Sequence, residues 1–103
     1  MSDDLIQKLT NLLDDNLIPY MEILNCDEIN INATVKVYFP EIMLNICKFL
    51  DKKFILEDKE SIFIQKDIDG YHFVEISFFM ENEKRTIIIH SILQNTWGIT
   101  NKF

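Results

Sequence analysis

The sequence predicts an α+β domain in which helices pack on one mixed or antiparallel β-sheet. An amphipathic helical pattern opens the chain, a strand and a second helix follow, and short strand patterns fill the rest. The predicted order is therefore α-β-α-β-β-β, with a short C-terminal helix around Trp97 as an option. The 103 residues are 48% hydrophobic, which is enough for one core, so we expect residues 1–103 to form a single domain.

The first helix is predicted within residues 2–24. Ser2 suits its start, because a serine hydroxyl accepts a hydrogen bond from a free backbone N–H group. Leucines then recur at helical spacing, opposite to polar residues. Pro19 disfavours helical geometry at the residue before it, so the helix ends or kinks there, and whether residues 20–24 continue it stays open. The leucines of the expected apolar face are Leu5, Leu9, Leu12, Leu13 and Leu17.

A strand is predicted at residues 29–39, where the hydrophobic period changes to two. Apolar side chains alternate from Ile31 to Phe39, so they point to one face of a sheet. Pro40 then suits the first turn of a helix, because its missing N–H donor costs nothing there. The apolar face of this second helix consists of Ile42, Ile46, Phe49 and Leu50. We expect it to end near residues 51–53.

The second half of the chain is predicted to be rich in strands. Turns are expected at Asp69 and Gly70 and at residues 81–84. Three consecutive isoleucines at residues 87–89 lack alternation, which is typical of a central strand covered on both faces. The predicted strands are residues 54–56, 61–65, 71–80 and 85–93.

The charge of the chain favours a protein partner. Seventeen acidic residues against ten basic ones give a formal net charge of −7. This excess opposes nucleic-acid binding, because phosphate binders concentrate Lys and Arg. A basic protein surface is complementary, although the acidity can also serve solubility alone. No apolar run is long enough for a signal peptide or a membrane span, so we expect no membrane contact and a cytoplasmic location, in a bacterium or in the host of a phage.

Six acidic residues are candidates for the surface that would dock on such a partner. They occur in the first helix, shortly after it, and in a charged run near the middle of the chain, and the alternative for each is an ordinary solvated position. Exposed aromatic residues would strengthen the case, and Tyr38, Tyr71 and Phe79 are predicted opposite to the main apolar face. The six candidates are Asp14, Asp15, Glu22, Glu57, Asp58 and Glu60.

The sequence offers little for catalysis or metal binding. It has two glycines and no phosphate-binding loop motif. Cys26 and Cys47 lack the spacing of metal ligands, so we expect reduced thiols, no disulfide, no metal and no other cofactor. His72 and His90 lie on predicted strands without a nearby carboxylate or thiol pattern, which favours a structural role over catalysis.

Four short segments occur in an order known from one enzyme family. They are residues 26–29 (Cys-Asp-Glu-Ile), 33–37 (Ala-Thr-Val-Lys-Val), 70–71 (Gly-Tyr) and 86–91 (Thr-Ile-Ile-Ile-His-Ser), with Trp97 at the expected distance. In this arrangement residues 26–103 resemble the synthetase domain of the RelA/SpoT alarmone synthetases. The resemblance implies a nucleotide-transferase-like sheet after the N-terminal helix.

The resemblance does not extend to the catalytic residues. Family members transfer pyrophosphate from ATP to GDP or GTP with magnesium, using an Asp on the first strand and a Glu on a later one. Those positions hold Ile31 and Thr86 here, which offer magnesium no carboxylate. Tyr71 matches the tyrosine that stacks on the acceptor guanine, and Lys36 and His90 could meet a phosphate. The alternative for Tyr71 is a strand aromatic after a turn.

Three functional hypotheses follow. The first is a small acidic, non-catalytic binding protein, such as an antitoxin, an immunity protein or a phage-type inhibitor. The second is a catalytically inactive synthetase-like domain that senses a guanine nucleotide or alarmone through Tyr71, Lys36 and His90. The third is a divergent nucleotide pyrophosphotransferase. A self-associating subunit is a further alternative, because the edge strands of a sheet need a cover.

Overall fold

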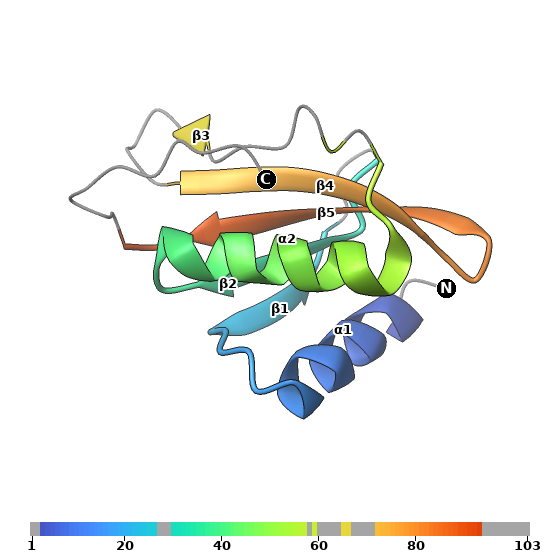
Figure 1. The fold of residues 1–103 in the computed structure, drawn as a ribbon, viewed down its shortest axis with the longest axis horizontal. Coiled ribbons are helices and arrows are strands. Elements are labelled where there is room, and N and C mark those ends of the chain that lie inside the picture. Colours follow the sequence, from blue (N-terminus) through green and yellow to red (C-terminus); the bar gives the residue numbers. More distant parts are fainter. Residues whose placement is uncertain (1–2, 27–29, 58, 60–64, 67–71, 94–103) are drawn as a thin grey trace.

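The computed structural model describes residues 3–26, 30–57, 59, 65–66 and 72–93. These residues form two helices and five strands (Figure 1). The helices are α1 (Asp3–Asp15) and α2 (Pro40–Phe54). The strands are β1 (Glu22–Asn25), β2 (Ala33–Val37), β3 (Gln65–Lys66), β4 (His72–Met80) and β5 (Glu83–Ser91). The predicted α+β class is confirmed.

The strands form one sheet in the order β1-β2-β5-β4-β3. The β2 and β5 strands run parallel, and the other three neighbouring pairs are antiparallel, so the sheet is mixed. The central position predicted for the three isoleucines is confirmed, because β5 lies in the middle of the order. Their cover is uneven, since Ile87 and Ile89 are fully buried while Ile88, on the other face, is only partly buried.

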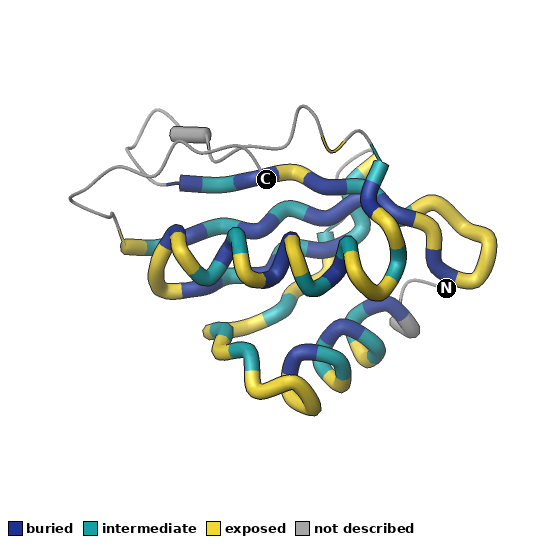
Figure 2. Tube along the Cα trace, viewed as in Figure 1, coloured by how far each residue is buried: buried dark blue, intermediate teal, exposed yellow. Residues whose placement is uncertain are grey.

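Both helices pack on the same face of the sheet, and the core lies between these two layers (Figures 1 and 2). Every third or fourth residue of each helix is buried, as the helical spacing predicted. Burying each such side chain stabilises the fold by roughly 1.5–3 kcal/mol. The helices contribute Leu5, Leu9, Leu13, Met43, Ile46, Cys47 and Leu50, and the strands contribute Ala33, Val35, Val37, Val74, Ile76, Phe78, Met80, Ile87 and Ile89.

The first helix ends earlier than residue 24, and Leu17 does not belong to its apolar face. Leu17 has a left-handed backbone, with φ of 57°, and is 89% exposed. The N–H groups of Leu17 and Ile18 donate to the carbonyls of Asp14 and Leu13, at 3.1 and 2.9 Å. These are the two hydrogen bonds of a Schellman motif, in which glycine usually takes the left-handed position. Residues 22–25 then form β1, which settles the segment that the sequence left open.

The strand predicted at residues 29–39 is shorter, because β2 spans Ala33–Val37. Its alternation is confirmed, with Ala33, Val35 and Val37 fully buried. Phe39 does not extend this face; it is 48% exposed and forms the N-cap of α2 with extended backbone. Pro40 occupies the first turn of α2, as predicted.

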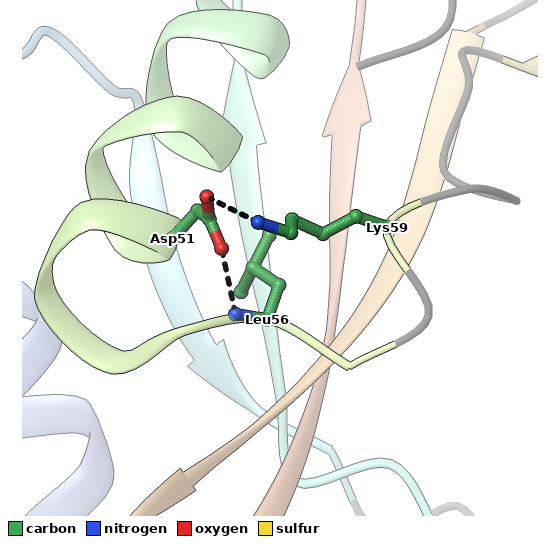
Figure 3. A network of polar contacts seen from close by, with 3 residues as sticks. All are labelled: Asp51, Leu56 and Lys59. Atoms are coloured by element: carbon green, nitrogen blue, oxygen red, sulfur yellow. Dashed lines mark hydrogen bonds and ion pairs between the residues drawn. The ribbon is translucent and has the colours of Figure 1, made fainter.

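Residues 54–56 do not form the predicted strand. Phe54 is the last residue of α2, and Leu56 makes only an isolated bridge to Phe78. Hydrogen bonds to Asp51 hold Ile55 and Leu56 at the end of α2 instead (Figure 3). Asp51 accepts the N–H of Ile55 at its carbonyl and the N–H of Leu56 at Oδ1, both at 2.9 Å, and Lys59 Nζ lies 3.4 Å from Oδ2. These bonds satisfy backbone groups that a strand would have paired with a neighbour.

A tight turn joins β4 and β5. Glu81 and Asn82 have φ of 54° and 67°, the left-handed pair of a two-residue hairpin loop. The predicted turn is therefore confirmed at its first two residues, whereas Glu83 already pairs with Met80 in the sheet. The expected turn at Asp69 and Gly70, most of the strand at residues 61–65 and the helix around Trp97 lie outside the described residues. In the part that is described, neither helix has the length and apolar character needed to cross a bilayer.

Candidate functional site

Within the residues that the structure describes, both helices lie on one face of the sheet, and we call the opposite face the second face. Side chains alternate along each strand, so every residue next to a core residue points to this face. The burial of β4 and β2 alternates accordingly. The side chains of the second face are Glu22, Leu24, Thr34, Lys36, Phe73, Glu75, Ser77, Phe79, Lys84, Thr86, Ile88 and His90. It combines apolar, basic and acidic groups.

Two of the three residues predicted to bind a nucleotide are direct neighbours on this face. The parallel register of β2 and β5 pairs Lys36 with His90, and both side chains are partly buried. Phe73 lies opposite His90 on β4, which adds an aromatic ring to the same row. Tyr71, the third predicted residue, lies outside the described residues. This row brings a cation, an imidazole and an aromatic ring side by side.

An acidic side chain completes the row on the side of β1. Glu22 pairs with Lys36 in the register, and its Oε1 lies 3.7 Å from Lys36 Nζ. The Lys36 and Glu22 side chains are 35% and 47% exposed, so water screens this ion pair and it contributes about 0–1 kcal/mol. An anionic ligand could therefore compete with Glu22 for Lys36 at little cost.

Thr86, one of the two positions that the resemblance assigns to magnesium ligands, has another role in the structure. The Thr86 hydroxyl lies 2.8 Å from Ser77 Oγ, and the Thr86 N–H donates to Asn32 Oδ1 at 2.9 Å. Beside them is a polar hollow of about 420 Å³, lined by Asn30, Asn32, Lys84 and Thr86. Among the described residues, no group of three or more His, Cys, Asp or Glu side chains is arranged to hold a metal ion.

Three of the predicted docking acids flank the segment that joins α1 to β1. Asp14 and Asp15 are exposed in the last turn of α1, and Glu22 is the first residue of β1. The Tyr20 hydroxyl donates to Asp14 Oδ1 at 2.8 Å, and this hydrogen bond raises the pKa of Tyr20 above its ordinary value. The exposed stretch between the two elements is visible in Figure 2. We call Asp14, Asp15, Leu17 and Met21 the α1–β1 corner, since the Glu22 side chain points to the second face and pairs with Lys36 there.

Glu57 is not part of this corner. The N–H of Glu57 donates to the carbonyl of Ser77 on β4, and β4 is separated from β1 by β5 and β2. Glu57 also pairs with Lys84, at 3.3 Å. Asp58 and Glu60 lie outside the described residues. The structure therefore separates Glu57 from Asp14, Asp15 and Glu22.

The sequence did not predict that Leu17 and Met21 are exposed at the corner. Leucine spacing alone assigned Leu17 to the core face of the helix, and Met21 carried no signal. The absence of a glycine after the helix was the available clue, because some other residue then has to adopt the left-handed conformation that ends it. The predicted exposure of Tyr38 and Phe79 is confirmed.

Comparison with known proteins finds no matching family model, no matching curated protein and no matching solved structure. The resemblance to the alarmone synthetases therefore stays a prediction. The second face and the α1–β1 corner are the two candidate sites of the described residues.

Proposed function

We propose that this protein is a small, non-catalytic binding protein that docks its α1–β1 corner on a partner protein with a basic surface. An antitoxin, an immunity protein or a phage-type inhibitor in the cytoplasm would act in this way. The observation that carries the proposal is Leu17, a large apolar side chain that is 89% exposed on a left-handed backbone. Three features of Leu17 and its surroundings are unfavourable for the stability of the isolated protein.

The first two features concern Leu17 itself. A left-handed conformation costs a residue with a Cβ atom about 1–2 kcal/mol, and glycine avoids this cost. The exposed Leu17 side chain does not offset this cost, because it buries almost no surface in the fold. Buried against a partner, a leucine side chain would contribute roughly 1.5–3 kcal/mol. A binding role accounts for a residue that the isolated fold disfavours.

The third feature is the charge of the helix end. The carbonyl end of a helix carries partial negative charge, so carboxylates there are unfavourable and bases favourable. The last turn of α1 contains Asp14 and Asp15 and no basic residue. By contrast, the last turn of α2 contains Lys52 and Lys53. The acids of the corner therefore act against their own helix, and a cationic partner would offset them.

The same charges select a basic protein over a second copy of this chain. Two corners facing one another would bring Asp14 and Asp15 of both copies together, in a protein that carries a net charge of −7. Like charges in contact are destabilising, whereas opposite charges accelerate association and favour docking. Exposed Leu17 and Met21 beside the acids fit a surface that combines Lys or Arg with an apolar patch.

Leu17→Gly is expected to change stability and binding in opposite directions. Glycine removes the left-handed strain, so the free energy of unfolding should rise by about 1 kcal/mol, measured by urea denaturation. Loss of the side chain should reduce capture of the partner at least tenfold when tagged protein is incubated with host lysate and bound proteins are quantified by mass spectrometry. Capture should also weaken as salt concentration rises.

Ile55→Gly is the matched control. Ile55 also has a left-handed backbone, with φ of 64°, and is 73% exposed, but it follows α2. It should gain similar stability and keep the captured partner. Three outcomes would contradict the proposal: no protein retained in stoichiometric amount, an acidic protein retained, or equal retention by both variants.

One observation favours guanine-nucleotide binding as a second candidate function. The register places Lys36 beside His90, with Phe73 as the next side chain of the row. A phosphate at Lys36 and a base stacked on the ring would use all three groups. Calorimetry with GDP, GTP and alarmones should then give heat for the wild type and about tenfold weaker binding for Lys36→Met. Absence of heat at millimolar ligand would remove this candidate.

A further inference from the structure

A cavity of about 320 Å³ opens between α1, the end of α2 and the β4–β5 turn. Its apolar wall consists of Leu12, Phe54 and Met80. The Phe54 ring is held in place by stacking on Phe78, with ring centroids 5.1 Å apart, so this part of the wall is preformed. The volume falls at the lower end of the range for small-molecule pockets, roughly 300–1,000 Å³.

The charged groups at the cavity are one acid and two bases. Lys8 Nζ lies 2.6 Å from Glu81 Oε2, so these two charges compensate one another. The hydrogen bond and the charge of Lys8 also lower the pKa of Glu81, which keeps this carboxylate ionised in the pair. Lys53 makes no ion pair with any residue that the structure describes. The charge offered to a ligand is therefore the single ammonium group of Lys53.

We propose that this cavity binds a small amphipathic carboxylate. Its hydrocarbon part lies against Leu12, Phe54 and Met80, and its carboxylate pairs with Lys53. A single cation above an apolar wall matches a monoanion with an apolar tail. A cationic amphiphile would meet Lys53 with like charge, because the carboxylate of Glu81 is already bound by Lys8. The cavity shares no residue with the α1–β1 corner, so this inference is independent of the proposed function.

A series of straight-chain carboxylates tests both parts of the proposal. The full chain is titrated with butanoate, hexanoate and octanoate, and binding is measured from the changes in amide NMR shifts. The affinity should increase about fourfold for each added methylene until the cavity is full. The largest shifts should map to Leu12, Phe54 and Met80. Octylammonium should bind at least tenfold more weakly than octanoate.

Two neighbouring lysines supply the matched variants. Lys52 and Lys53 are both exposed in the last turn of α2, but only Lys53 lines the cavity. Lys53→Met should weaken octanoate binding about fivefold, and Lys52→Met should leave it unchanged. The proposal is overturned by the absence of shifts at millimolar octanoate, by equal binding of octylammonium, by the lack of chain-length dependence, or by equal effects of the two variants.

Discussion

Replacing Phe78 with alanine is expected to lower the free energy of unfolding by about 3–5 kcal/mol. Phe78 is fully buried in β4, its ring stacks on Phe54, and it pairs with Leu56 across an isolated bridge. Alanine would leave a cavity where α2 meets the sheet. Domains of this size are stable by only 5–15 kcal/mol, so a large part of the stability would be lost. Urea denaturation followed by circular dichroism measures the change.

The adjacent residue provides the control. Phe79 has the same side chain but points to the second face and is 51% exposed. Phe79→Ala should therefore change the free energy of unfolding by less than about 1 kcal/mol. Because side chains alternate along a strand, a slip of one residue would exchange the two phenylalanines. Equal losses for the two variants would contradict the register described here.

The parts of the fold that the sequence predicted well are those in which one local pattern decides the structure. Alternating burial of Ala33, Val35 and Val37 follows from period-two hydrophobicity, and α2 begins where Pro40 fixes its first turn. Both patterns act within a few residues of the chain, so they can be recognised without knowledge of the neighbours.

The parts that were missed depend on contacts between distant residues. The four residues of β1 do not alternate in burial, and they form a strand because β2 pairs with them. Leu56 looked like a strand residue by composition, but the Asp51 carboxylate takes its N–H group. In both cases a partner elsewhere in the chain satisfies the backbone, and hydrophobic spacing contains no information about that partner.

The candidate sites likewise combine features that the sequence predicted with features that depend on contacts between distant residues. Composition indicated an acidic docking surface, but the fold places Asp14 and Asp15 at the end of α1, Glu22 beside Lys36 in the sheet and Glu57 beside β4. Lys36 and His90 are 54 positions apart in the sequence, and the parallel pairing of β2 with β5 makes them neighbours. The sequence supplied these residue types, and the strand order decided which of them share a surface.

The ends of the two helices show why the corner stands out. Both helices are followed by a large apolar residue in the left-handed conformation, Leu17 after α1 and Ile55 after α2. The α2 end is supported by Asp51 and by bases in its last turn. The α1 end has acids in its last turn instead. The two helix ends therefore share the left-handed conformation but differ in charge, and the unfavourable charge occurs at the α1–β1 corner.

Cys47 is expected to react with iodoacetamide about a thousandfold more slowly than an ordinary thiol near neutral pH. It lies fully buried in α2, and burial raises its pKa from 9.0 to about 12. The thiolate is the reactive form, and a pKa that is higher by about three reduces the thiolate population near neutral pH about a thousandfold. Cys26, which is partly buried, serves as the internal control. Mass spectrometry of labelled peptides over time should show modification of Cys26 first, and equal rates would contradict the packing of α2 on the sheet.

The same burial predicts how stability changes at alkaline pH. Because the folded protein raises the pKa of Cys47, the neutral thiol stabilises the fold fully below pH 9, and this contribution is lost as the pH rises from about 9 to about 12. Above pH 9 the unfolded chain releases the thiol proton while the folded chain retains it, which favours unfolding by up to about 1.4 kcal/mol per pH unit. Cys47→Ala lacks this proton, so its stability should fall less steeply in urea denaturation between pH 8 and pH 10. Parallel curves for the two proteins would mean that water reaches the thiol and that α2 is less closely packed than its buried face indicates.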